Sequence, residues 1–269
     1  WLKNDDTKNL VMPSRRNYYS YFYAFNFDPK FDAEFQPENW KIAVNNENFR
    51  KSIMFGLDRV KVLAVSEPNN PDKQVMNTIT PPDFVDYEGT DYTQIGSLKD
   101  ISSRDSFNAD EAKKYAQKAK DELKAKGATF PVKILLPYNP STTNWDKESQ
   151  VVEQQLEGVL GKDYIDIIPE AGPATGFLSA VRRSGKYAMM KCNWGPDYAD
   201  PETYTDPFAP NDKNGEGGGT YNWPEKVEGY TDADGNKTYS NLFYAAKAQT
   251  TDVKKRYEAF AEAEAFLVN

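Results

Sequence analysis

The chain has 269 residues, of which 39% are hydrophobic and 14% aromatic, and 33 basic against 41 acidic side chains give a net charge of −8. This apolar content excludes an intrinsically disordered chain, because a disordered chain lacks the apolar surface that offsets its ordering entropy. The negative charge, with no local cluster of Lys or Arg, argues against nucleic acid and anionic lipid surfaces as partners.

Histidine is absent from the sequence, and cysteine occurs once, as Cys192. Without histidine the chain cannot build a Ser-His-Asp or Cys-His nucleophile or an imidazole metal site. Cys192 lies in a run typical of a buried strand and is expected to pack as a small apolar side chain. We therefore expect no catalytic residue, no metal and no cofactor, although chemistry by paired carboxylates stays open.

The chain shows no targeting or membrane-spanning segment. No apolar run approaches the roughly 18 to 20 residues that span a bilayer. Because the chain begins at Trp1 without a basic-then-apolar signal segment, we expect an excised or processed piece of a longer protein.

The first half of the chain predicts a strand, a loop and a helix. The aromatic run at residues 18–27 favours a strand, and residues 30–47, rich in Asp, Asn and Pro, are expected to form a loop. A helix is predicted to begin near Asn48. Its apolar positions at helical spacing are Phe49, Ile53, Leu57 and Val60. Residues 67–107, dense in Pro, Asp, Gly and Ser, are expected to wrap over a surface or line a cleft.

The second half alternates between helices and strands. The clearest helix spans residues 108–127, since Asn108 is a suitable N-cap, Glu111 stands three residues on, and Gly127 can adopt a left-handed conformation. The elements predicted after it are a strand at 131–136, a helix at 146–160, a strand at 164–168, a helix at 175–184, a strand at 187–193 and a last helix at 251–267. This alternation predicts an α/β fold with a mixed, partly parallel sheet flanked by helices.

The segment that follows the last predicted strand carries the candidate site. In open α/β sheets ligands lie at the carboxyl ends of the strands. Gly195 and Pro196 turn the chain there, and Asp197 is flanked by Trp194 and Tyr198. A carboxylate walled by aromatic rings is a good receptor for an ammonium group. On the residues alone, a second interpretation stays open, in which Asp197 and its neighbour at position 200 only cap a turn or the following helix.

Four stretches in this order resemble the oligopeptide-binding proteins of ABC importers, the family 5 extracellular solute-binding proteins. They are residues 48–59 (Asn-Phe-Arg-Lys-Ser-Ile-Met-Phe-Gly-Leu-Asp-Arg), residues 77–82 (Asn-Thr-Ile-Thr-Pro-Pro), the helix at 108–127 with its following strand, and residues 194–201 (Trp-Gly-Pro-Asp-Tyr-Ala-Asp-Pro). The resemblance implies one lobe of a two-lobed, type II periplasmic-binding-protein-like fold. Residues 1–47 would be an approach or hinge segment and residues 48–269 the ligand-binding lobe. The first lobe, the lipid-anchoring N-terminus and the returning C-terminal strands would lie outside this chain.

The resemblance also implies a function, which is the non-enzymatic capture of oligopeptides at the extracellular face of the membrane or in the periplasm. The partners implied are a peptide ligand, the permease subunits of an ABC importer and the missing first lobe. The ligand-binding residues implied are Asp197 for the peptide's α-ammonium, Trp194, Gly195 and Tyr198 around it, Arg182 and Lys191 for a ligand carboxylate, and Asn139 in a pocket. Arg182 and Lys191 also fit a solvated helix end and a strand edge, and Asn139 a plain turn. Arg50, Asp58 and Arg59 are expected to be structural.

Two other classes of protein are weighed against this one. A carbohydrate-active protein would use the aromatic rings as sugar platforms and Asp197 and Glu202 as its carboxyls. A calcium-stabilised module would use residues 232–236, but the spacing and the bidentate Glu of a calcium loop are missing, so a tight turn is favoured. Residues 215–219 are expected to be a flexible glycine-rich loop.

Overall fold

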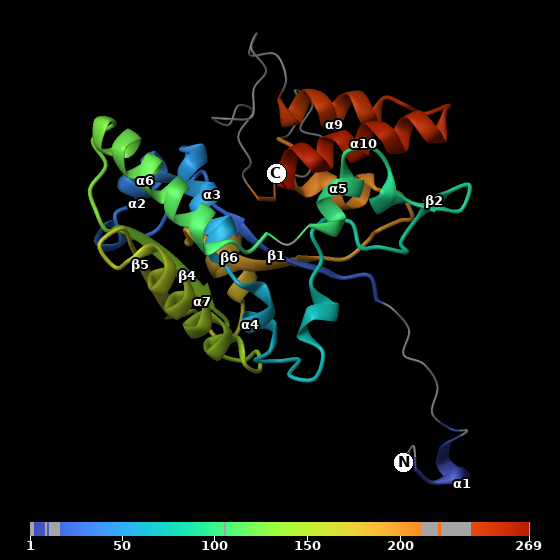
Figure 1. Ribbon diagram of the computed structural model, residues 1–269, viewed down its shortest axis with the longest axis horizontal. Coiled ribbons are helices and arrows are strands. Elements are labelled where there is room, and N and C mark those ends of the chain that lie inside the picture. Colours follow the sequence, from blue (N-terminus) through green and yellow to red (C-terminus); the bar gives the residue numbers. More distant parts are fainter. Residues whose placement is uncertain are drawn as a thin grey trace.

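The computed structural model describes residues 3–8, 10, 17–104, 106–210, 220–221 and 238–268. The strands are β1 (Ser20–Phe25), β2 (Asp86–Tyr87), β3 (Thr90–Asp91), β4 (Val132–Tyr138), β5 (Ile165–Ala171) and β6 (Met189–Trp194). The helices are α1 (Asp5–Lys8), α2 (Pro37–Val44), α3 (Glu47–Gly56), α4 (Arg59–Leu63), α5 (Leu98–Ser103), α6 (Ala109–Ala125), α7 (Trp145–Leu160), α8 (Glu202–Thr205), α9 (Tyr239–Lys247) and α10 (Val253–Val268) (Figure 1). Among the helices so described, none is long and apolar enough to cross a membrane.

The strands pair in both senses. β4 and β5 are parallel, with Val132 opposite Ile165, whereas β1 and β6 form an antiparallel ribbon with Ser20 opposite Trp194. Just before β6, the Ala188 N–H donates to the Leu135 carbonyl of β4 at 2.9 Å. The prediction of an α/β fold with a mixed, partly parallel sheet is therefore confirmed.

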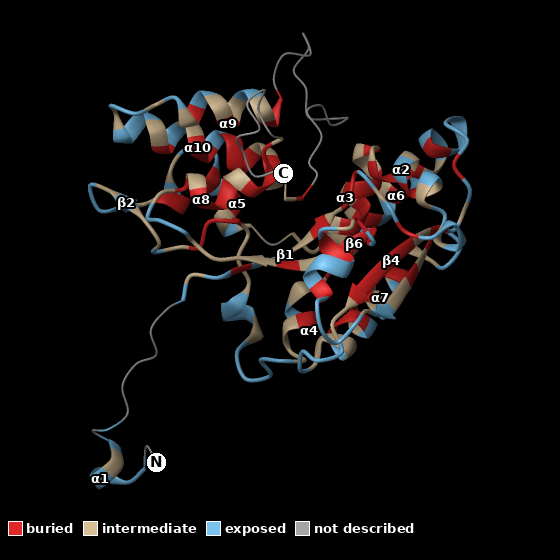
Figure 2. Cartoon of the chain, turned by 180° about the vertical axis from the view of Figure 1, so that it is seen from behind, coloured by how far each residue is buried: buried red, intermediate tan, exposed pale blue. Residues whose placement is uncertain are grey.

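The chain has two hydrophobic cores, and the β1–β6 ribbon lies between them. The first core joins α2, α3, α6 and α7 to β4 and β5. The second gathers α5, α8, α9 and α10. Figure 2 shows the buried residues of both cores on either side of β1 and β6.

Alternation of side chains along the ribbon explains how it serves both cores. Successive residues of a strand point to opposite faces of the sheet. Phe25 and Met189 accordingly pack on the first core, whereas Ala24, Met190 and Cys192 belong to the second. Cys192 is 4% exposed, which confirms its predicted role as a small core residue.

The best-marked predicted helix is confirmed. The Asn108 side chain caps α6 by accepting from the Glu111 N–H at 3.1 Å, and Gly127 follows the helix with a φ of +82°. Three further predictions are confirmed with small shifts at the ends of the elements. The helix predicted at 146–160 is α7, and the strands predicted at 164–168 and 187–193 are β5 and β6.

The prediction of a loop at residues 30–47 was wrong, because α2 occupies Pro37–Val44. Trp40 of α2 is 0% exposed, and its indole N–H donates to the Asn26 carbonyl at 2.8 Å. Pro37 stands in the first turn, where a proline fits a helix start. The polar residues around Trp40 hid this short amphipathic helix.

The helix predicted from Asn48 through Val60 is in fact two helices. α3 ends at Gly56, and the Asp58 side chain caps α4 by accepting from the Lys61 N–H at 3.2 Å. Val60 is consequently 39% exposed instead of lying on the apolar face. This capping confirms the structural role expected for Asp58.

Three further segments differ from the prediction. Residues 67–107 contain the β2–β3 hairpin and α5, so they are not a plain wrapping loop. The helix expected at 175–184 is reduced to a π-helical segment, Leu178–Arg182. α9 was not predicted, and the predicted turn at 232–236 and loop at 215–219 lie outside the described residues.

Candidate functional site

The site begins where β6 ends at Trp194. A Cβ added to the next residue, Gly195, would lie 3.0 Å from Cζ of Tyr19. The Tyr19 ring therefore covers the position that any larger side chain would need. A larger residue at position 195 would therefore require the half-exposed Tyr19 ring to move.

The two aspartates after β6 have different surroundings. The Asp197 N–H donates to Thr203 Oγ1 at 2.9 Å, which fixes the turn, while its exposed carboxylate has no hydrogen bond or ion pair to any residue that the structure describes. The Asp200 carboxylate instead accepts from the Glu202 N–H at 2.9 Å and pairs with Arg256 Nε at 2.8 Å. Among the residues that the structure describes, capping and ion pairing thus belong to Asp200 and not to Asp197.

Trp194 and Tyr198, the aromatic neighbours of Asp197, face different surroundings. The Trp194 ring is partly buried against the second core, 6.5 Å from the ring of Tyr221. Tyr198 is 50% exposed. Partial burial, followed by the nearby carboxylates of Glu202 and other acids, raises the pKa of Tyr198 to about 12. Its phenol is therefore protonated at neutral pH and can donate a hydrogen bond.

Arg182 is 9% exposed, so it does not lie at a solvated helix end. Its guanidinium carbon lies 5.7 Å from the ring centroid of Tyr221. The hydroxyl of the same Tyr221 donates to the Asn193 carbonyl of β6 at 3.1 Å. The Tyr221 side chain therefore contacts both Arg182 and β6. The buried donors Arg182 Nε, Tyr187 Oη and Trp194 Nε1 find no hydrogen-bond partner in the part of the chain described.

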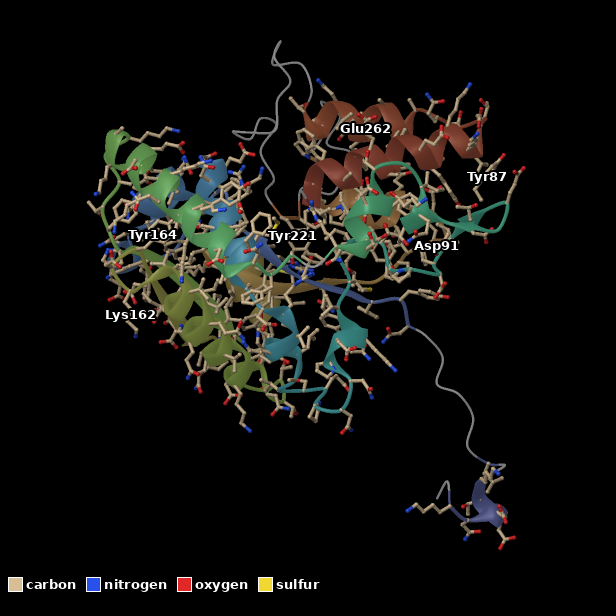
Figure 3. The ribbon with its side chains drawn as sticks, viewed as in Figure 1. Tyr87, Asp91, Lys162, Tyr164, Tyr221 and Glu262 are labelled. Atoms are coloured by element: carbon tan, nitrogen blue, oxygen red, sulfur yellow. The ribbon has the colours of Figure 1, made fainter. Side chains whose placement is uncertain are left out.

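Tyr221 is one residue of this site that the sequence did not reveal. It is 1% exposed and lies between the α9–α10 pair and the β1–β6 ribbon (Figure 3). Its ring stacks on Phe208 at 4.7 Å and meets Phe22 of β1 at 5.3 Å. No local pattern marks it, because its contacts come from segments far away in the chain.

Lys191 lies on the other face of the ribbon from Trp194, since the two are an odd number of residues apart on one strand. Lys191 Nζ donates to Glu148 Oε2 of α7 and lies 5.6 Å from the ring centroid of Tyr21. Glu148 is 3% exposed and also accepts from Ser66 Oγ at 2.5 Å. No local pattern points to Glu148, because it stands in a polar run of a helix.

Asn139 follows β4 and forms a turn. Its side-chain Oδ1 accepts from the Ser141 N–H at 2.9 Å, and its carbonyl accepts from the Thr142 N–H at 3.0 Å. The plain-turn interpretation is therefore confirmed, and a pocket-lining role for Asn139 stays a prediction.

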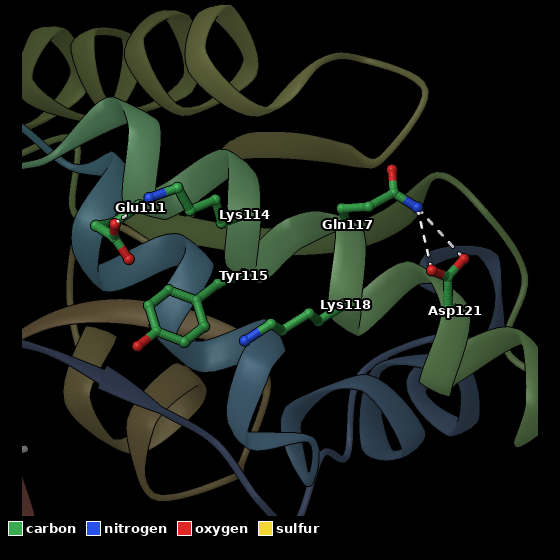
Figure 4. A pocket seen from close by; sticks show the side chains of 6 residues that line it. All are labelled: Glu111, Lys114, Tyr115, Gln117, Lys118 and Asp121. Carbon is green, nitrogen blue, oxygen red and sulfur yellow. Dashed lines mark hydrogen bonds and ion pairs between the residues drawn. The ribbon is translucent and has the colours of Figure 1, made fainter.

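Two surface depressions lie away from the predicted site. One of about 370 Å³ runs along α6 and is lined by Glu111, Lys114, Tyr115, Gln117, Lys118 and Asp121 (Figure 4). Within it, Lys114 pairs with Glu111 at 2.6 Å, so these charges already have partners on their own helix. Another of about 400 Å³ lies between α2 and Lys126. Neither of these two depressions includes a residue of the segment that follows β6.

The geometry gives no support to the other two classes of protein. Glu202, proposed as a second catalytic carboxyl, binds Arg256 Nη2 at 2.5 Å and Lys247 Nζ at 3.3 Å, so it is already occupied by two cations. Within the described ranges, no three His, Cys, Asp or Glu side chains come together to hold a metal ion.

The fold is that of the ligand-binding proteins that serve peptide ABC transporters. A crystal structure described as the peptide-binding protein of a peptide ABC transporter is similar with a TM-score of 0.65 at 22% identity, and the match covers 93% of this chain and 94% of that one. The model of the bacterial extracellular solute-binding proteins, family 5 (middle region), matches residues 1–216, and the chain belongs to this family.

Two curated relatives are similar over most of this chain. The oligopeptide-binding protein AliB of Streptococcus pneumoniae serotype 4 is 28% identical over 97% of this chain and 44% of its own length. The oligopeptide-binding protein AliA of the same organism is 32% identical over 87% of this chain and 38% of its own length. The chain thus spans less than half the length of these relatives. The predicted family is confirmed.

Proposed function

We propose that this chain is the ligand-capturing lobe of an oligopeptide-binding protein that delivers peptides to an ABC importer and catalyses no reaction. Membership of the solute-binding family and similarity to AliB and AliA support this function. Because the chain covers 44% of AliB, the other lobe would belong to the rest of a longer protein. That protein would act at the extracellular face of the membrane, held by a lipid anchor, or in the periplasm, and would meet the permease subunits there.

The observation that carries the proposal is the carboxylate of Asp197, which is exposed and has no partner among the described residues, beside two paired acids. Asp200 is paired with Arg256, and Glu202 with Arg256 and Lys247, so two cations balance these two acids and neither acid competes for a ligand cation. Asp197 is exposed at the end of β6, and its carboxylate has no ion pair with a described residue. We assign to it the α-ammonium group of a bound peptide.

Closure of a second lobe would make this interaction strong. An exposed ion pair contributes about 0 to 1 kcal/mol, whereas a pair 4 Å apart at an effective dielectric of about 20 has roughly 4 kcal/mol of Coulomb energy before desolvation. A hinge motion that covers the peptide would exclude water and move the pair toward the second regime. The exposure of Asp197 suits a site whose other wall comes from a second lobe.

The remaining predicted residues form the surroundings of the ligand. The peptide backbone would lie extended beside strand-like edges, as in β-strand addition, and ordered water would fill the space around its side chains. Gly195 lets Tyr19 approach the strand end, and the protonated Tyr198 can donate to a ligand carbonyl. Arg182 keeps an unpaired buried Nε–H, which supports its predicted role toward a ligand carboxylate.

The test compares trialanine with N-acetyl-trialanine by calorimetry on the whole protein. Acetylation removes the ammonium charge, so we expect binding to weaken at least about tenfold, the ratio that 1.4 kcal/mol produces. Asp197→Asn should weaken trialanine binding by a similar factor and leave acetylated and free peptide equally weak. Asp110→Asn, which removes the same charge from the exposed start of α6, is the matched control and should change neither affinity.

Equal binding of the acetylated and the free peptide by the wild type would contradict the role of Asp197. Nanomolar binding of peptide by the present chain alone would contradict the role of a second lobe.

A further inference from the structure

A buried acid lies beneath the ribbon that leads into the proposed site. Glu148 of α7 is 3% exposed, and its two oxygens accept from Lys191 Nζ and from Ser66 Oγ. Burial, followed by the charge of Glu148, raises the pKa of Tyr23, the residue opposite Lys191 on β1. The carboxylate of Glu148 therefore lies against the same face of the ribbon as Lys191.

That face continues to the surface beside the proposed ammonium site. Tyr19 and Tyr21 alternate onto it with exposures of 46% and 59%, and the Lys191 ammonium lies over the Tyr21 ring. Lys191 stands three residues before Trp194, which is about 10 Å along a strand. If the peptide's ammonium group is held at the end of β6 and its backbone runs back along the ribbon, its third residue would lie about this far along, and the carboxylate of a tripeptide would come near Lys191.

Lys191 is nevertheless bound to its internal partner. A buried carboxylate must be paired or hydrogen-bonded. If Lys191 turned to a ligand, Glu148 would keep only the Ser66 hydroxyl, and the free energy lost there would exceed the gain from one exposed charge-assisted bond to the ligand. The side chain of Lys191 is 26% exposed and that of Glu148 is 4% exposed. A ligand carboxylate would therefore approach Lys191 from solvent and compete with a partner that is buried.

We propose that Glu148 is a specificity-determining residue of the proposed peptide site, because it cancels the charge of Lys191. Lys191 then does not select for a ligand carboxylate, and peptides whose chain continues past this point, or whose carboxyl end is blocked, are accepted there as readily as free tripeptides. This inference rests on the proposed function and adds to it the class of peptide that the site accepts.

The test measures, on the whole protein, the ratio of Kd for trialanine amide to Kd for trialanine. In the wild type and in Lys191→Gln the two ratios should agree within about twofold, since the lysine is already neutralised. Glu148→Gln frees the ammonium, and the ratio should rise about tenfold in favour of the free carboxylate, the factor expected for one charge-assisted bond. The double variant Glu148→Gln/Lys191→Gln should restore the wild-type ratio.

A ratio that falls more than threefold in Lys191→Gln would show that this lysine selects carboxylates despite Glu148, and would overturn the inference. So would an unchanged ratio in Glu148→Gln. Should Glu148→Gln fail to fold, Lys191→Gln and the double variant, in which two amides replace the ion pair, still decide the question. N-acetyl-trialanine binding as tightly as trialanine would refute the proposed function separately, and a wild type that binds neither peptide would overturn both.

Discussion

Asp197 and Asp200 lie three residues apart in one turn, and their replacement by asparagine should affect stability very differently. Asp200 accepts two hydrogen bonds from Arg256, at 2.8 Å to Nε and 2.9 Å to Nη2, and their side chains are only 21% and 15% exposed. In Asp200→Asn an NH₂ group would face the guanidinium, and one charge-assisted bond would be lost. Arg256 keeps Glu202 and the carbonyls of Lys247 and Gln249, so it is not left without partners.

We expect Asp200→Asn to lower the free energy of unfolding by about 2–3 kcal/mol, below the roughly 3–5 kcal/mol seen when a fully buried pair is broken. For a chain of this size, this corresponds to a fall in Tm of roughly 4–12 °C. Asp197→Asn should change the free energy by less than about 0.5 kcal/mol, because its carboxylate has no partner within the described residues.

Urea denaturation followed by circular dichroism measures both variants, with the slope m checked to confirm that the compactness of the two states is unchanged. Equal destabilisation by Asp197→Asn and Asp200→Asn would refute the reasoning, since it would mean that Asp197 also has an internal structural partner.

Three further substitutions test the cores and their polar contacts. Burial raises the pKa of Glu264, although hydrogen bonds from Thr80 and Tyr92 oppose the shift. The folded state therefore holds this proton more tightly than the unfolded state, and the free energy of unfolding should fall as pH rises above the unfolded pKa of about 4.3. Glu264→Gln should remove this decline when urea titrations at pH 4.5 and pH 7 are compared. Asn46→Ala removes the hydrogen bond that caps Phe49 N–H at 2.8 Å and the one to Glu122 at 2.7 Å, and should lower the free energy of unfolding by about 2 kcal/mol. The control Asn45→Ala removes only a bond to the Lys41 carbonyl and should lower it by about 0.5 kcal/mol. Equal losses in the two variants would contradict the capping role of Asn46. Leu156→Ala should lower the free energy of unfolding by about 2–5 kcal/mol, because this fully buried side chain fills the space above Gly56. Val60→Ala, at a partly exposed position, is the control and should change it by less than about 0.5 kcal/mol. A small loss in Leu156→Ala would mean that neighbouring side chains relax into the vacated space.

Much of the fold could be predicted because its signals are local. Asn108 and Gly127 mark the two ends of α6 by capping chemistry that involves only neighbouring residues. The alternation of strands and helices after residue 131 reflects periodicities of two and 3.6 residues, which the sequence carries directly. Prediction failed where a short element depends on one distant contact, as in α2, which Trp40 anchors through the carbonyl of Asn26.

The candidate site was only half visible in the same way. Consecutive residues predict the turn that presents Asp197 between Trp194 and Tyr198. The composition shows that histidine is absent, which argues against several kinds of enzyme. The state of each charge is not local. Asp200 is neutralised by a residue 56 positions away, and Lys191 by one 43 positions away.

By itself, the sequence determined the α/β class, the family resemblance and the turn that carries the candidate carboxylate, because hydrophobic spacing, capping and turn chemistry act between neighbours. Only the tertiary structure decided which charges are available. Alternation along β6 directs Trp194 to one core and Lys191 to the other face of the ribbon, where Glu148 neutralises it. Whether a carboxylate is paired internally depends on which distant segments the fold brings within 4 Å, as Arg256 is brought to Asp200.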